Sequence, residues 1–163
     1  DPGEVVEDGD TIEENARIKA HAWLDLNPDC VVLADDTGLF VDALDGAPGI
    51  YAARYAGEDV TYADNCNKLI KELQDVPSEK RTAKFSTCAV AVRADSSDIL
   101  SIGSVEGAIT QENTGDGFGY DPVFIPKGYD QTFVELGTSV KNMISHRARA
   151  FRALAHGIKD AKW

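Results

Sequence analysis

Cys30-Val31-Val32-Leu33-Ala34-Asp35-Asp36-Thr37-Gly38 is an apolar run that ends in two adjacent carboxylates. An apolar run of this length indicates a buried strand over 30–34, and a strand ordinarily ends in turn residues rather than paired charge. Because adjacent acids repel each other, a positive group is expected beside Asp35 and Asp36. Two interpretations stay open here. The acids form a polar turn, or they belong to a ligand site, which open α/β sheets place at the carboxyl ends of their strands.

The elements predicted around this run alternate between helix and strand. A helix is expected from Thr11 to about Leu26, since Thr11 and Glu14 fit the capping-box pattern and Asn27-Pro28 ends it. The other expected elements are short strands over 39–41 and near 123–125, a helix over about 61–74, a hairpin of two long strands over 82–94 and 99–110, and a helix from about 139 to 159. This order predicts a mixed α/β or α+β fold.

Composition limits the class of protein. A chain of 163 residues suits one domain, 1–163, and its net charge of −12 argues against a nonspecific nucleic-acid or membrane-surface binder. Three cysteines without CxxC spacing make a disulfide framework or zinc site a poor prediction, so a reducing cytoplasm is the expected compartment. Cys30 and Cys88 lie in apolar runs and are expected to be small buried hydrophobes.

The acids around the first strand predict a metal site. The helix from Thr11 is long enough to pack beside the following strand, where Glu14 would project toward Asp35 and Asp36. Three carboxylates around a hard dication, completed by waters and a substrate phosphate, is the pattern of magnesium. The alternative is that Glu14 only caps its own helix.

Two later segments carry groups that suit a nucleotide. Glycines on both sides of Phe118 permit close approach of a flat ligand, on which Phe118 or Tyr120 would stack; alternatively these aromatics fill the core. Lys141 is a point charge suited to phosphate, while His146 and Arg147 offer donors to purine ring acceptors. Taken singly, each of these three residues is better explained as an exposed helical base.

Five segments together resemble the inosine triphosphate pyrophosphatase family, the hydrolases of non-standard purine nucleoside triphosphates. The resemblance runs from about Gly9 to about Leu154 in the family's order. Its text is Thr11-Ile12-Glu13-Glu14-Asn15-Ala16 with Lys19-Ala20, Ala34 to Leu39, Gly46 to Tyr51 with Ala53-Arg54-Tyr55, Gly117 to Phe124, and Ser145-His146-Arg147.

The resemblance implies an elongated fold of two lobes around a central mixed sheet, with the substrate in a cleft between them. It also implies a homodimer, a Mg²⁺ requirement, and hydrolysis of inosine, deoxyinosine and xanthosine triphosphates to the monophosphate and pyrophosphate. The implied metal ligands are Glu14 and Asp36, with Asp36 also the base and Asp35 supporting the acidic site. The implied substrate contacts are Thr37, Phe118, Gly119, Tyr120, Asp121, Lys141, His146 and Arg147.

One departure from the family concerns its first element. The family begins with a strand and a phosphate-binding loop, and nothing here matches either, so the sequence is expected to start after them. This leaves an alternative function open, a catalytically inactive nucleotide-binding or sensing module of the same fold.

Overall fold

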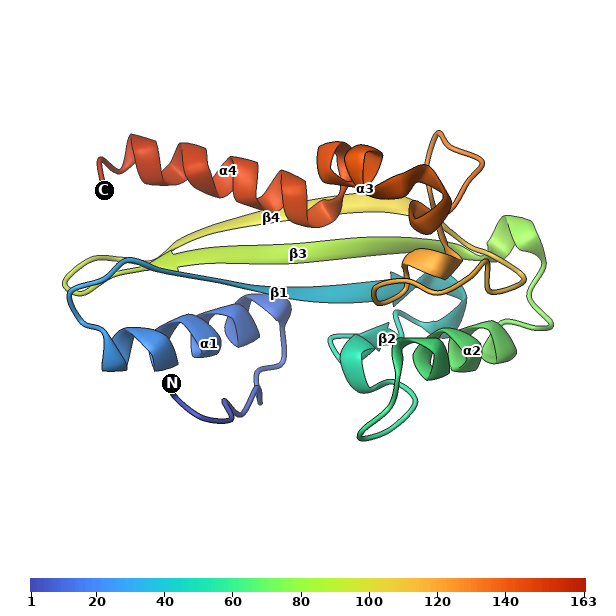
Figure 1. Cartoon of the computed structure of the whole chain (residues 1–163), viewed down its shortest axis with the longest axis horizontal. Helices are drawn as coiled ribbons and strands as arrows, with labels where there is room; N and C mark the ends of the chain where they lie inside the picture. Colours follow the sequence, from blue (N-terminus) through green and yellow to red (C-terminus); the bar gives the residue numbers. More distant parts are fainter. The chain divides into compact units, whose positions relative to one another are not determined.

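The computed structural model describes residues 1–163 and shows helices packed on one sheet (Figure 1). The helices are α1 (Ile12–Leu26), α2 (Tyr62–Glu72), α3 (Phe133–Ile144) and α4 (His146–Asp160); the strands are β1 (Val32–Val41), β2 (Pro48–Gly49), β3 (Thr82–Val92), β4 (Ile99–Ile109) and β5 (Phe124–Pro126). The strand order is β2-β1-β3-β4-β5, with β2 antiparallel to β1 and β5 antiparallel to β4. No helix has the length and apolar character that crossing a bilayer requires. The predicted mixed α/β fold is confirmed.

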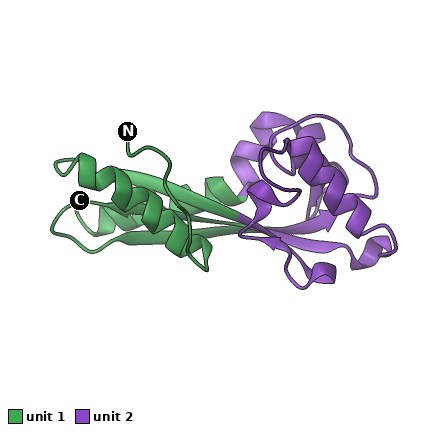
Figure 2. Cartoon of the chain, turned by 90° about the horizontal axis from the view of Figure 1, so that it is seen from below, with its two compact units in different colours: residues 1–37, 86–104, 146–163 green, residues 38–85, 105–145 purple.

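The chain divides into two compact units, each assembled from segments that are distant in sequence (Figure 2). Unit 1 contains residues 1–37, 86–104 and 146–163, and unit 2 contains residues 38–85 and 105–145. Strands β1, β3 and β4 each contribute residues to both units, so three of the chain's passages between units lie inside strands. These units correspond to the two predicted lobes, whereas the cleft that the resemblance implies stays a prediction.

Unit 1 is a three-layer arrangement in which β3 is buried on both faces. Ala89 and Ala91 of β3 pack against Ala150 and Leu154 of α4. Since successive side chains of a strand point to opposite faces, the intervening residues of β3 face the other layer, where α1 lies (Figure 1). Helix α1 buries its apolar stripe, consisting of Ile12, Ala16, Ala20 and Leu24.

Unit 2 is built around an aromatic cluster. The Phe124 ring meets Phe85 edge-on, with centroids 4.6 Å apart, and stacks on Phe133 at 5.5 Å. Arg81, only 3% exposed, joins the end of α2 to this core. Its guanidinium donates hydrogen bonds to the backbone carbonyls of Leu73, Val76 and Thr110 at 2.6, 2.9 and 2.7 Å. The bonds to Leu73 and Val76 hold the segment that follows α2, and the bond to Thr110 connects it to the residue after β4.

Strand β1 is longer than predicted, and this corrects the position of the acidic pair. The strand was expected to end at Ala34, but it continues through Asp35 and Asp36 to Val41. The reason is tertiary, because Leu39 and Val41 are fully buried in the core of unit 2 and β2 pairs with this end of the strand. The turn interpretation of 35–38 is therefore wrong.

The C-terminal helix predicted over 139–159 is in fact two helices. Helix α3 begins at Phe133 because Thr132 and Glu135 form a reciprocal capping box, and it ends where Ser145 adopts extended backbone angles of −63° and 156°. Serine is a favoured N-cap, so this break also starts α4. A second correction concerns Cys30, which is exposed rather than buried, while Cys88 is buried as expected.

Candidate active site

Alternation along β1 places the two adjacent acids on opposite faces of the strand. Arg147 of α4 donates to Asp35 Oδ2 from Nε at 2.9 Å, and its Nη2 lies 2.7 Å from the same oxygen. Lys19 of α1 donates from Nζ to Asp36 Oδ1 at 2.7 Å. Helices α1 and α4 lie on opposite sides of the sheet (Figure 1). Each acid therefore has its own cation, which supplies the positive groups that the sequence demanded.

Asp36 lies in a confined polar environment in unit 1. Its side chain is 12% exposed, and Lys19 Nζ also lies 3.2 Å from Glu7 Oε2. Burial raises the pKa of Asp36, and the hydrogen bond and charge of Lys19 only partly offset this. Burial alone would lower the pKa of Lys19, but the bonds and charges of Asp36 and Glu7 outweigh it and raise that pKa. Lys19 therefore stays charged beside Asp36.

Thr37, the next residue of β1, connects the acidic pair to β3. Its hydroxyl lies 2.7 Å from the hydroxyl of Thr87, so one donates to the other. Thr87 is fully buried, so this contact fixes the strand next to Asp36.

Thr11 caps α1 as predicted, but the Glu14 side chain accepts from Asp10 rather than from Thr11 as a full capping box requires; Glu14 also retains oxygens for a cation. Its backbone N–H donates to Thr11 Oγ1 at 3.1 Å, and its Oε2 accepts from the backbone N–H of Asp10 at 2.7 Å. No group of three or more His, Cys, Asp or Glu side chains surrounds a common point, and Asp35 does not share a face with Asp36. The structure therefore does not bring the three predicted carboxylates together.

The donor set nevertheless suits magnesium. Glu14 and Asp36 offer hard carboxylate oxygens, and Asp36 already binds one cation, the Lys19 ammonium. Magnesium keeps several waters and takes one or two carboxylates plus substrate phosphate, so two protein ligands are sufficient.

The predicted base-binding residues lie in unit 2, where they play unequal parts. The Phe118 side chain is 59% exposed and available to a ligand. Tyr120 is only 5% exposed and donates from its hydroxyl to the Ala52 carbonyl at 2.7 Å, so it fills the core. Gly119 has a left-handed φ of 55°, and its carbonyl accepts a hydrogen bond from Cys66 Sγ at 3.3 Å. Phe118 is therefore the ring of this segment that is open to stacking.

Lys141 connects this segment to α3. Its ammonium forms an ion pair with the carboxylate of Asp121 and lies 5.2 Å from the centroid of the Phe118 ring. Burial raises the pKa of Asp121, an effect that Lys141 partly offsets. Gly137, with a φ of 82°, kinks α3 before Lys141. Unlike Lys141, His146 and Arg147 belong to unit 1, so the structure divides a segment that the sequence treats as one.

Lys19 is a residue of the candidate site that the sequence did not predict. The segment Lys19-Ala20 is part of the resemblance, but the sequence alone assigned no role to Lys19. A signal was present, since paired acids need a positive group and α1 directly precedes β1. Glu7, which contacts Lys19, and Thr87, which contacts Thr37, were also not predicted, because neither lies in a local pattern that indicates such a contact.

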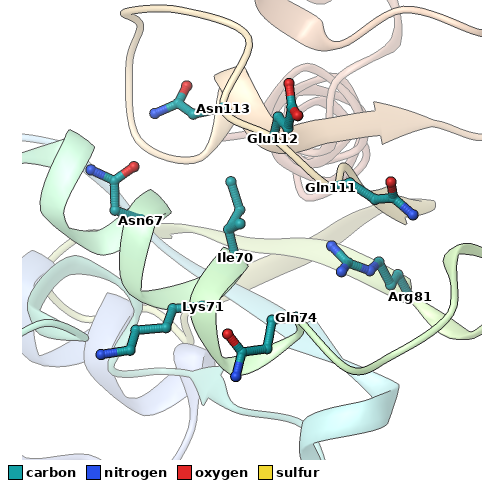
Figure 3. Close-up of a pocket in the computed structure, with 8 residues that line it drawn as sticks. All are labelled: Asn67, Ile70, Lys71, Gln74, Arg81, Gln111, Glu112 and Asn113. Atoms are coloured by element: carbon teal, nitrogen blue, oxygen red, sulfur yellow. The ribbon is translucent and has the colours of Figure 1, made fainter.

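A pocket in unit 2 contains none of the predicted site residues. This pocket, of about 640 Å³, lies in unit 2 beside α2 (Figure 3). It is lined by Asn67, Ile70, Lys71, Gln74, Arg81, Gln111, Glu112 and Asn113. Figure 3 shows that Lys71, Gln74 and Glu112 point in different directions rather than toward one point, which does not favour a specific ligand.

Known proteins resemble this chain over most of its length. A sequence model of the Ham1 family matches residues 1–157. The chain belongs to the Ham1 family. This Ham1 chain is 46% identical over 160 residues to the dITP/XTP pyrophosphatase of Shouchella clausii, covering 96% of this chain and 79% of the relative. It is 49% identical over 154 residues to the dITP/XTP pyrophosphatase of Bacillus licheniformis, covering 93% and 78%.

Solved structures support the same assignment of this Ham1 chain. The Staphylococcus aureus Ham1 protein superimposes with a TM-score of 0.89 at 38% identity, covering 97% of this chain and 81% of that one. The resemblance that the motifs indicated is thus confirmed over most of the chain.

Proposed function

We propose that this Ham1 protein hydrolyses the triphosphates of inosine, deoxyinosine and xanthosine to the monophosphate and pyrophosphate, and so removes non-standard purines from the nucleotide pool. The observation that carries the proposal is Asp36, a confined carboxylate held by Lys19 in a chain whose relatives are named dITP/XTP pyrophosphatases. A carboxylate beside a cation, with its pKa raised by burial, is suited to accept a proton from water.

In this mechanism Asp36 takes a proton from a water whose oxygen attacks the α-phosphorus. The bond from the α-phosphorus to the bridging oxygen breaks, and pyrophosphate leaves with the electron pair. Lys19 holds the carboxylate in place and stabilises its charge until the proton arrives. Arg147, whose guanidinium is 53% exposed while it bonds to Asp35, presents further N–H donors to a phosphate or base oxygen.

Mg²⁺ is part of this proposal. Glu14 and Asp36 would hold it, and when bound it would neutralise and polarise the triphosphate.

Base recognition falls to the exposed ring of Phe118 and to donors of the segment 118–121, which belong to one unit. A hydroxypurine presents an O6 acceptor, whereas adenine presents an amino donor that would leave such donors unpaired. We therefore expect ATP to be a poor substrate.

The test is pyrophosphate release from inosine, xanthosine and adenosine triphosphates with magnesium. We expect release from the first two and at least ~100-fold lower kcat/KM with ATP, as expected when buried donors are left unpaired. Asp36→Asn should reduce kcat by about 100-fold or more, the share of a general base, while the fold stays nearly intact because Lys19 keeps Glu7 as a partner. Retained inosine triphosphate binding without any release by the unmodified protein would instead favour the inactive binding module.

We also propose a homodimer in the cytoplasm, where the three free thiols would stay reduced. Light scattering coupled to gel filtration measures the first of these directly.

A further inference from the structure

Two exposed aromatic rings contact each other at the edge of the base segment. The Tyr62 and Phe118 rings lie with centroids 5.1 Å apart and planes inclined at 61°. Both residues are open to solvent, with 48% and 59% of their surface exposed. Edge-to-face contacts of this kind are favourable beyond simple burial. The pair forms an aromatic corner, which we define as Tyr62 and Phe118, and which leaves ring surface free for a flat ligand.

The backbone that carries Phe118 is fixed, but its side chain depends on neighbours. A Cβ at Gly117 would lie 2.4 Å from Val134 Cγ2, so the chain passes close to α3 there. The Phe118 carbonyl accepts the N–H of Asp121 at 3.1 Å. The Phe118 ring contacts the Tyr62 ring and the Lys141 ammonium. Lys141 also forms an ion pair with Asp121. Tyr62 is thus the aromatic contact that restricts the Phe118 ring.

Tyr62 is itself held rigidly, because it is the first residue of α2. Thr61 caps this helix by a reciprocal capping box with Asp64, with N–H to oxygen distances of 2.8 and 3.1 Å. One turn later Cys66 donates to the Gly119 carbonyl. Residues four apart lie on the same side of a helix, so α2 contacts the loop twice, at the Phe118 ring and at the Gly119 backbone.

We propose that Tyr62 is a positioning residue of the base subsite, which orients the Phe118 ring for stacking on a hydroxypurine nucleotide. This inference rests on the proposed function and assigns a residue to base selection at that site. Tyr62 acts through its ring, because its hydroxyl makes no hydrogen bond within the chain. Because the Phe118 ring is already ordered by Tyr62, less conformational entropy is lost when the nucleotide base binds, and the nucleotide binds more tightly.

The experiment is a double-mutant cycle on Tyr62 and Phe118. Inosine monophosphate binding is measured by calorimetry, and pyrophosphate release from inosine triphosphate is measured in parallel. Tyr62→Ala should weaken monophosphate binding and raise KM about two- to twelve-fold, the range of an aromatic pair, with kcat changed less than about two-fold. Tyr62→Phe should restore both values. Tyr129→Ala, which removes another exposed tyrosine of unit 2, should leave both unchanged.

The decisive comparison is Tyr62→Ala in the Phe118→Ala background, where we expect less than a two-fold further effect on binding. An equal loss in both backgrounds, or an unchanged KM for Tyr62→Ala alone, overturns the inference even if pyrophosphate is released. Coupled binding without pyrophosphate release by the unmodified protein keeps the inference and rejects the proposed activity. If the unmodified protein neither binds inosine monophosphate nor releases pyrophosphate, both the inference and the proposed activity are rejected.

Discussion

At the scale of single residues, burial and one ion pair together set the chemical state of Asp36. Lys19 reaches Asp36 from α1 at 2.7 Å, and both side chains are largely shielded from solvent. Removing one partner of a shielded pair leaves an uncompensated charge, which is more damaging than losing an exposed pair.

We therefore predict that Lys19→Met lowers kcat/KM for inosine triphosphate by about ten-fold or more, the scale of leaving a shielded charge unpaired. Lys19→Arg should retain part of the activity because it keeps the charge. Arg17→Met is the matched control on the same helix, since Arg17 contacts Asp98 at 3.6 Å and is half exposed. Equal losses from Arg17 and Lys19 variants would contradict the role given to Lys19.

The three thiols should differ in reactivity. Burial raises the pKa of Cys66 and of Cys88 to about 11, whereas Cys30 is exposed. Because the thiolate is the reactive form, a disulfide reagent at pH 8 should titrate one thiol rapidly in the native protein and three in denaturant. Loss of the rapid phase in Cys30→Ser would identify it.

Asp121 should give a pH dependence of stability. Its folded pKa lies above the unfolded value of 3.8 because it is buried. The native state thus holds this proton more tightly, and the stability it contributes is present below pH 3.8 and lost as pH rises through the folded pKa. In thermal melts between pH 3.5 and 7, Asp121→Asn should lack this decline. Parallel profiles for both proteins would show that Asp121 does not titrate in this way.

At the scale of elements, short sequence patterns predict a helix or strand correctly where the structure depends on neighbouring residues. The caps at Thr11 and Thr61 follow from their own side chains, so α1 and α2 were predicted close to their observed bounds. The same capping pattern at Thr132 and Glu135 starts α3 six residues before the predicted helix start at 139. The continuation of β1 through the acids was not predictable, because it depends on burial of Leu39 and Val41 by distant segments.

Gly103 offers a test of how α4 packs on β4. A Cβ there would lie 2.2 Å from the His146 carbonyl oxygen and 2.3 Å from the Ala150 nitrogen, both backbone atoms. Gly103→Ala should therefore lower the free energy of unfolding by about 1–3 kcal/mol, the range of overpacked sites, as measured in urea. The neighbouring exposed Ile102, changed to Thr, should shift it by no more than about 0.5 kcal/mol.

At the scale of the whole molecule, the candidate site was predictable in composition but not in arrangement. Residues far apart in sequence, such as Asp35 and Arg147, were named individually, yet their contact depends on α4 covering one face of the sheet. Resemblance supplied roles for these residues. The pairing of each acid with its own cation needed the fold.

The net charge of −12 opposes the binding of a triphosphate anion unless cations bind with it. We predict that chelation of divalent cations abolishes pyrophosphate release and that added magnesium restores it. The melting temperature should change little, since Asp35 and Asp36 already have Arg147 and Lys19 beside them. A large drop in melting temperature on chelation would mean that the metal stabilises the fold itself.

The interleaved segments of the two units have a consequence for synthesis on the ribosome. Unit 2 has all its residues once Ser145 has been made, whereas unit 1 also needs residues 146–163. Until α4 emerges, Ala89 and Ala91 lack the helix that covers them, although their strand already belongs to the finished part of the chain. Nascent chains therefore expose this alanine face to chaperones and aggregation until residues 146–163 have been made, so the unit that carries Asp36 becomes native after unit 2.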